Sequence, residues 1–212
     1  MALAGVPLLE HAVQRALEAP EVRHVVVVAP TSHLREAGAI ASRAVRADDV
    51  DVVAGGAERT ESVAAGMKAL RADDGIVLVH DAARALAPAS LFSRLVREVR
   101  NGHPAVVPGM PVNDTIKQVD ATGRVVATPD RAALRAIQTP QAFLREVLEH
   151  AHTRAAGSHA TDDAALVERV GGHVRVVDGD PMAFKITTAD DLATAERHLA
   201  GDPEEPAHSH GR

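Results

Sequence analysis

Short apolar runs alternate along this chain with longer segments in which apolar residues recur every three or four positions. The runs lie at residues 25–28, 51–54, 76–79 and 105–108, of which 51–54 opens with Asp51. The segments with helical spacing cover 6–18, 32–46, 58–70 and 88–100. Continuous apolar runs of this length are typical of strands that are buried on both faces. Strands that alternate with helices predict an α/β fold with a doubly wound, mostly parallel sheet.

The pattern changes after Pro111. Residues 114–119 and 125–127 flank the polar segment 120–124, and this arrangement predicts a β-hairpin. It is the only strong antiparallel signal in the chain. A lone hairpin buries little core of its own, so we expect residues 111–133 to form a projecting arm that packs against a second subunit.

The remaining segments predict further helices and strands of the same domain. We expect helices over 141–154, 161–170 and 188–199, a polar loop up to His159, and strands over 173–177 and 183–186. Thr161 is a candidate N-cap, and Thr188 opens a segment that resembles a capping box. Residues 1–200 are predicted to form one domain. Residues 201–212, rich in Pro, Glu, His and Gly, are predicted to be a disordered tail.

Composition narrows the functional classes. The 212 residues suit one domain with a single core, and 23 Lys and Arg against 29 Asp and Glu give a net charge of −6, which disfavours a general nucleic-acid binder. The chain has no cysteine, which excludes disulfides and thiolate metal sites and favours the reducing cytoplasm. No apolar stretch approaches the roughly 20 residues that span a bilayer, so no membrane association is expected.

Candidate chemistry stands where the apolar run 76–79 ends. His80 and Asp81 follow it directly, and Arg84 lies one turn further on. In open α/β sheets the ligand crevice lies at the carboxyl ends of the strands, so this cluster is a candidate site. A second interpretation is equally consistent with the cluster alone: Asp81 caps the following helix and pairs with Arg84.

Six segments, in order, identify a family that this chain resembles. They are Gly55-Gly56-Ala57-Glu58-Arg59-Thr60-Glu61-Ser62-Val63, Val77-Leu78-Val79-His80-Asp81-Ala82-Ala83-Arg84, Asp114-Thr115-Ile116-Lys117, Gln138-Thr139-Pro140-Gln141, Thr161-Asp162-Asp163-Ala164 and Phe184-Lys185-Ile186-Thr187. Together they resemble the 2-C-methyl-D-erythritol 4-phosphate cytidylyltransferases of non-mevalonate isoprenoid biosynthesis. The resemblance implies a Rossmann-like nucleotidyltransferase fold, CTP as co-substrate, and a homodimer in which the arm completes the neighbour's site.

The resemblance implies a nucleotide side of the site. Gly55 and Gly56 would present backbone groups to cytosine, with the Ser62 hydroxyl and Ala82 nearby, since glycine permits close backbone approach. Asp81 would lie near the ribose and hold Mg²⁺ together with phosphate oxygens. The alternative for the two glycines is a plain turn. Ala57 departs from relatives that carry a polar residue there, and Arg59 could help to hold the loop.

Catalysis and substrate binding are implied for a second group of residues. Lys185 would stabilise charge on the attacked α-phosphate, and Asp81 is the second residue implied as catalytic; for Lys185 the alternative is a solvated lysine at a strand end. Hydroxyls and an arginine suit a phosphate anion. The resemblance places Thr139, Thr161 and Lys185 against the substrate phosphate in one subunit, and brings Thr115 and Arg131 from the partner's arm. Thr161 could serve as a helix cap as well.

The chain departs from the family at its start. Family members begin with a strand and a glycine-rich loop whose arginine and lysine clamp the triphosphate, whereas this chain begins just downstream, at Met1-Ala2-Leu3-Ala4-Gly5. The absent strand is expected between the strands at 25–28 and 77–79, so two buried edges would be left unpaired and the fold destabilised. We therefore expect the natural product to carry roughly 25 further residues of the strand-loop type.

Two alternatives to the leading function follow. One is the same chemistry on ribitol 5-phosphate or another polyol phosphate, because the motifs do not separate these substrates. The other is a non-catalytic dimeric protein that binds nucleotide, because the phosphate loop is missing. In the leading interpretation the substrate phosphate attacks the α-phosphorus of CTP, and since that phosphate is ionised at neutral pH no general base is required.

Overall fold

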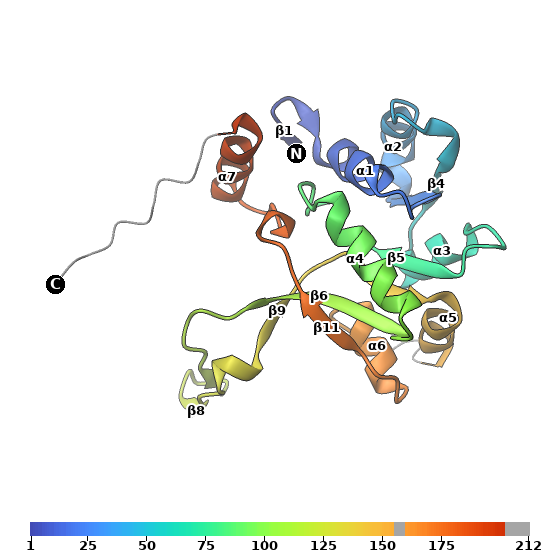
Figure 1. The fold of residues 1–212 in the computed structure, drawn as a ribbon. Coiled ribbons are helices and arrows are strands. Elements are labelled where there is room, and N and C mark those ends of the chain that lie inside the picture. Colours follow the sequence, from blue (N-terminus) through green and yellow to red (C-terminus); the bar gives the residue numbers. More distant parts are fainter. Residues whose placement is uncertain (155–159, 202–212) are drawn as a thin grey trace.

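The main strands of the computed structural model fall into two sets (Figure 1). The structure describes residues 1–154 and 160–201. One set is β3 (Val25–Ala29) paired in parallel with β4 (Val50–Ala54). The other set has the order β5, β10, β6, β11. Its strands span Ile76–Val79 (β5), Gln141–Leu144 (β10), Ala105–Pro111 (β6) and Arg175–Asp178 (β11).

Strand directions confirm the predicted fold class. β10 runs antiparallel to both β5 and β6, so these two share one direction, and β11 is parallel to β6. β3 starts beside β5, because His24 Nδ1, just before β3, lies 3.3 Å from Asp74 Oδ2, just before β5. The main strands other than β10 therefore point the same way, as in a mostly parallel α/β sheet. The short strand β9 (Arg135–Ile137) pairs antiparallel with the end of β6.

Helices cover both faces of the sheet. They span Leu8–Glu18 (α1), Leu34–Ala41 (α2), Arg59–Lys68 (α3), Ala89–Arg100 (α4), Arg145–Arg154 (α5), Asp163–Arg169 (α6) and Ala189–Ala200 (α7). Two short strands, Ala2–Leu3 (β1) and Val6–Pro7 (β2), pair before α1. Within the described ranges, no helix is long and apolar enough to cross a bilayer.

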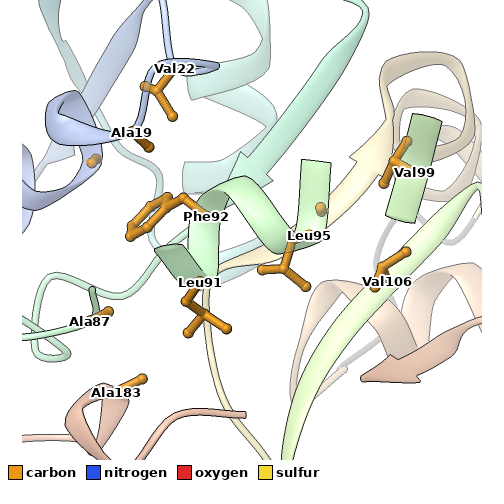
Figure 2. Packing of buried hydrophobic residues seen from close by; sticks show 11 residues of the cluster. Ala19, Val22, Ala87, Leu91, Phe92, Leu95, Val99, Val106 and Ala183 are labelled. Carbon is orange, nitrogen blue, oxygen red and sulfur yellow. The ribbon is translucent and has the colours of Figure 1, made fainter. Parts of the chain in front are cut away.

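The core is built around α4, whose buried residues recur every three or four positions as its helical spacing predicts. Figure 2 shows Phe92 of α4 facing Ala19 and Val22, and Val99 beside Val106 of β6. A second cluster on the opposite face joins α3, α5 and α6 to the sheet through Met67, Leu148, Leu166, Val77 and Phe143. The sheet thus lies between two apolar layers.

An apolar slot separates the two sets of strands. Among the described residues β3 pairs only with β4, and β5 only with β10. Between β3 and β5 lies a cavity of about 730 Å³, lined by residues 25–28 and 76–79 and by α1, α3 and α4. The two unpaired edges expected from the sequence are therefore confirmed. Of β5 only Val77 is buried, so the prediction of a strand buried on both faces is wrong, because no described strand pairs with β5 on the side of β3.

The predicted hairpin is present. β7 (Gln118–Val119) and β8 (Val125–Ala127) pair antiparallel, and the Asp120 carboxylate accepts hydrogen bonds from the backbone N–H groups of Thr122 and Arg124. Gly123 takes the left-handed conformation that closes the turn. The hairpin projects away from the sheet, at the lower left of Figure 1, as expected for an arm.

Several predicted elements differ from the structure. The hairpin is not the only strong antiparallel pair, because residues 141–144 form β10 between β5 and β6 rather than the first turn of α5. Non-local pairing here overrides the helical spacing. Residues 183–186 form no strand, because Asp180 caps a single turn at Pro181–Ala183. The helix predicted over 32–46 ends at Ala41.

The N-cap of α6 is Asp162 rather than Thr161, since the Asp162 side chain accepts from the backbone N–H of Ala165. The capping box predicted for α7 is confirmed, with reciprocal hydrogen bonds between Thr188 and Asp191. The end of the predicted loop at His159 and residues 202–212 of the predicted tail lie outside the described residues.

Candidate active site

Asp81 and Lys185 meet at the carboxyl end of β5. Lys185 Nζ lies 3.1 Å from Asp81 Oδ2. Two contacts bring their segments together: the Ile186 N–H donates to the Ala83 carbonyl at 2.8 Å, and Arg84 Nη1 donates to the Ala183 carbonyl at 2.6 Å. The structure thus joins the two residues that the resemblance named as catalytic.

The alternative in which Asp81 caps the next helix and pairs with Arg84 is wrong. α4 begins at Ala89, and its N-cap is Pro88. The Arg84 guanidinium donates to backbone carbonyls, including that of Ile137 at 3.4 Å, and so braces the loops around the site. The Asp81 carboxylate is paired with Lys185 instead.

The electrostatics of Asp81 favour its ionised form. Burial opposes ionisation, but the hydrogen bond and charge of Lys185, together with the nearby charges of Arg59 and Arg84, outweigh it and lower the pKa of Asp81. Asp81 therefore carries a negative charge at neutral pH. This charge holds the Lys185 ammonium at the strand end, although that side chain is about half exposed.

Thr139 forms a hydrogen bond with the backbone of Asp81. Its hydroxyl accepts from the Asp81 N–H at 3.0 Å and lies 3.1 Å from His80 Nδ1, and Thr139 itself is buried. Burial lowers the pKa of His80 to about 4, so the imidazole is neutral at pH 7. Its Nε2 is buried without a hydrogen-bond partner in the described part of the chain. The hydroxyl that the resemblance assigned to substrate thus already binds within the protein.

The two glycines of the predicted nucleotide loop are required by close packing. A Cβ at Gly55 would stand 2.7 Å from Ser62 Oγ, and one at Gly56 would stand 2.3 Å from Glu61 Cβ. The Gly56 N–H donates to Ser62 Oγ at 3.2 Å, and Ser62 Oγ donates to the Glu58 carbonyl at 3.1 Å. The loop is therefore a tightly fixed strand-to-helix connection, more specific than a plain turn.

Glu61 was not predicted as part of this loop. Its carboxylate accepts from the N–H groups of Ala57 and Glu58, at 2.8 and 3.3 Å, and completes a capping box at the start of α3. Two acidic residues spaced three apart at the start of a helical segment were the available signal. Because Ala57 contributes its backbone here, its lack of a polar side chain leaves the loop geometry intact.

One end of the slot is lined by three of the predicted nucleotide-side residues, Ser62, Asp81 and Ala82, but not by Gly55 or Gly56. Arg59, Ser62, His80, Asp81 and Ala82 all line the same cavity. These residues come from the start of α3 and the end of β5, which are separate in sequence. The structure therefore brings together the loop side and the aspartate side of the predicted site.

The predicted substrate-side residues are more dispersed. Thr161 is exposed just before the cap of α6. Thr115 and Arg131 are exposed on the arm, where Arg131 Nη1 donates to the Asn113 carbonyl. In the described part of one chain, neither arm residue forms a hydrogen bond or ion pair with Asp81 or Lys185. A single subunit does not bring the arm to the site.

Asp81 could hold a divalent cation only together with other ligands. Over residues 1–154 and 160–201, no three His, Cys, Asp or Glu side chains gather as a metal cage. Mg²⁺ is commonly held by one or two carboxylates, phosphate oxygens and water. A single strand-end carboxylate fits that mode of binding and does not fit a site made of protein ligands alone.

Comparisons with known proteins identify the family. The sequence model of the family described as IspD, 2-C-methyl-D-erythritol 4-phosphate cytidylyltransferase, matches residues 1–200. The chain is 52% identical over 199 residues to the protein of that name from Saccharopolyspora erythraea, covering 93% of this chain and 88% of the relative. It is 50% identical over 202 residues to a bifunctional enzyme IspD/IspF from Clavibacter michiganensis subsp. michiganensis, covering 94% of this chain but only 49% of that relative.

A solved structure agrees. That of 4-diphosphocytidyl-2C-methyl-D-erythritol synthase from Anaerococcus prevotii has a TM-score of 0.86 and 28% identity, over 94% of this chain and 92% of that one. The match covers both sets of strands, so the slot does not disturb the general architecture. The chain belongs to the 2-C-methyl-D-erythritol 4-phosphate cytidylyltransferase family.

Proposed function

We propose that this chain transfers the cytidylyl group of CTP to 2-C-methyl-D-erythritol 4-phosphate and releases diphosphate. The observation that carries the proposal is the Lys185–Asp81 pair at the rim of a cavity that also contains Ser62 of the glycine loop, in a chain of this family. A phosphate oxygen of the substrate forms a bond to the α-phosphorus as the bond to diphosphate breaks. The attacking oxygen is already ionised, so the protein needs to supply position and charge rather than a base.

Each residue of the site receives a role in this proposal. The Lys185 ammonium neutralises charge that develops on the α-phosphate, and Asp81 orients it. The backbone of Gly55, Gly56 and Ala82 and the Ser62 hydroxyl hold the nucleoside. Close packing around both glycines supports this assignment, because it fixes the backbone of the loop in place.

Substrate phosphate is proposed to bind near Lys185, with Thr161 and Thr139 from the same subunit. The Thr139 hydroxyl also positions Asp81, because it accepts a hydrogen bond from the Asp81 N–H. Asp81 is the residue that would hold Mg²⁺ when CTP is bound. When bound, this ion would offset negative charge on the phosphates.

A homodimer completes the proposed site. Val119, Val125 and Val126 on the arm are each at least half exposed, and Ile116 is 39% exposed. Such an apolar surface on a projecting hairpin favours burial against a second copy. In that dimer, Thr115 and Arg131 would reach the partner's substrate phosphate. A cytoplasmic location stays a prediction from the absence of cysteine.

The experiment is an assay of diphosphate release from CTP and Mg²⁺ with 2-C-methyl-D-erythritol 4-phosphate and, in parallel, ribitol 5-phosphate. We expect release with the first substrate and at least tenfold less with the second. Faster release with ribitol 5-phosphate would move the assignment to the other polyol phosphate. CTP binding without release from either substrate would favour a non-catalytic nucleotide-binding protein.

Light scattering after size-exclusion chromatography tests the dimer in the same preparation. We expect twice the mass of one chain for the wild type, and a shift toward the monomer for V125D. Asp replaces an exposed arm residue in this variant, so its fold should survive. A wild-type monomer that is fully active would contradict the arm's proposed role.

A further inference from the structure

A buried carboxylate, Asp163, lies where three helices meet. Asp163 is the first residue of α6 and has no exposed surface. Its Oδ1 is 2.8 Å from His152 Nε2 of α5, and its Oδ2 is 2.7 Å from an Nη atom of Arg59 of α3. Burial of a carboxylate is costly unless it is paired, and two partners from different helices meet that need.

Stability alone is a weak explanation for such a cluster. Apolar residues of similar size often replace buried ion pairs without loss of stability, whereas ionic groups can define one arrangement among several. The Arg59–Asp163 contact is also geometrically incomplete: Asp163 Oδ2 and Arg59 Nη1 are both buried and form no aligned hydrogen bond in the described chain. The contact therefore acts mainly through charge and position.

Arg59 connects this cluster to the active site. It is the first residue of α3, directly after the glycine loop, and it lines the same cavity as Asp81. Its charge is one of those that lower the pKa of Asp81. A residue that fixes the Arg59 guanidinium therefore fixes a cation close to the catalytic pair and the start of the helix that follows Gly56.

The residues just before Asp163 belong to the predicted substrate-binding part of the site. Thr161 and the cap residue Asp162 immediately precede it. Buried Gln141 of β10 donates from Nε2 to Asp162 Oδ2 at 2.8 Å and accepts from the Ala164 N–H at 3.3 Å. Since Gln141 is paired with Val79 of β5, the start of α6 is held in a fixed relation to the end of β5.

We propose that Asp163 is a positioning residue that holds Arg59 and, through it, sets the spacing between the nucleotide loop and the start of α6. This inference rests on the proposed function, and it concerns affinity for CTP rather than the transfer step itself. Loss of the Asp163 charge should free Arg59 and loosen the glycine loop. Lys185 and Asp81 would stay paired, because none of their contacts passes through Asp163.

The test compares D163N with the wild type in steady-state kinetics and in CTP binding by calorimetry. We expect the KM and Kd for CTP to rise about tenfold, while kcat changes less than threefold. A tenfold change is within the range of interaction energies between residues in contact. D163N in combination with R59Q should be no worse than the poorer single variant, because both changes break the same contact. H152Q removes the other partner and should lower the melting temperature with less than a threefold change in KM for CTP.

Two controls keep the outcomes separate. D49N breaks two other ion pairs, those of Asp49 with Arg46 and with Arg71, and should leave KM for CTP unchanged. Calorimetry does not depend on turnover, so a wild type without diphosphate release would refute the proposed function while the binding comparison still tests Asp163. If D163N lowers the melting temperature but keeps the Kd for CTP within twofold, Asp163 is structural only and the inference is wrong.

Discussion

The slot between β3 and β5 has a polar rim at each end, and the two rims differ in how fully their groups are paired. At the amino ends of the strands, His24 lies between the carboxylates of Asp51 and Asp74, at 2.9 and 3.3 Å, and Arg23 pairs with Asp73. At the carboxyl ends, His80 Nε2 is buried without a partner in the described chain. The first rim joins the two strand sets.

The charged groups of the amino-end rim therefore hold the fold together, whereas those of the carboxyl-end rim are placed to act on a substrate. The polar groups of the amino-end rim bind one another across β3, β4 and the start of β5, where no backbone ladder of the described residues crosses the slot. The carboxyl-end rim keeps the half-exposed Lys185 ammonium facing solvent beside Asp81. Groups that are positioned but incompletely satisfied are those that a substrate can engage. Substitutions at the two rims should therefore affect different measurements.

The largest effect is expected for K185A. Removal of the ammonium should lower kcat/KM by about 10²- to 10³-fold, as loss of one charge-stabilising group does in other enzymes. The urea midpoint of unfolding should change little, because Lys185 is about half exposed. K68A removes an exposed lysine at the end of α3 and serves as the control. Equal activity of K185A and K68A in the diphosphate assay would refute the role of the pair.

The carboxyl-end rim should also carry a pH dependence of stability. The pKa of His80 is about 4 in the folded chain, against 6.5 for the free side chain. As the pH falls below 6.5 the unfolded chain binds this proton first, so the free energy of unfolding should fall between pH 6.5 and 4, by about 3 kcal/mol at most.

H80Q isolates this contribution, because glutamine does not titrate. Urea unfolding of the wild type and of H80Q should give curves that differ in slope over this interval and run parallel above pH 7. Identical slopes for the two proteins would show that His80 binds its proton equally well in the folded chain.

A smaller effect is expected at the glycine loop. The Cβ of G56A would overlap Glu61 Cβ, so the loop must shift, at a cost of about 2 kcal/mol. We expect a raised KM for CTP and a modest loss of stability. G38A is the matched control, because nothing lies within 4 Å of a Cβ there and alanine favours the interior of α2. If G56A kept the wild-type KM for CTP, the proposal that this loop binds the nucleotide would be wrong.

The smallest effect on activity is expected at the amino-end rim. H24Q should lower the free energy of unfolding by about 1 kcal/mol, since one of the two carboxylate contacts of His24 is lost. The value of kcat/KM at 20–25 °C should stay within twofold of the wild type. A large loss of activity in correctly folded H24Q would break the contrast between the rims.

Local patterns predicted much of the fold. The helical spacing of α4 and the Thr188–Asp191 capping box each depend only on residues that are close together in the chain, so the sequence alone predicts them. The same holds for the hairpin around Gly123. The unpaired edges of β3 and β5 were expected only because the family resemblance supplied the strand order.

Non-local pairing decided what the sequence pattern missed. Residues 141–144 have helical spacing, yet they form β10 because β5 and β6 flank them. In the site, Lys185 and Asp81 were named from the resemblance and not from spacing, and their contact is seen only in the structure. Nothing local in the sequence pairs Arg59 with Asp163, since the partners lie on different helices.

The most direct test of the central claim follows the α-phosphate of CTP. The wild type is incubated with α-labelled CTP, Mg²⁺ and 2-C-methyl-D-erythritol 4-phosphate, and the products are separated. We expect the label in 4-diphosphocytidyl-2-C-methyl-D-erythritol, equimolar with released diphosphate, and almost none with K185A or D81N. Label transfer that both variants sustain at the wild-type rate would contradict the placement of the reaction at the carboxyl-end rim.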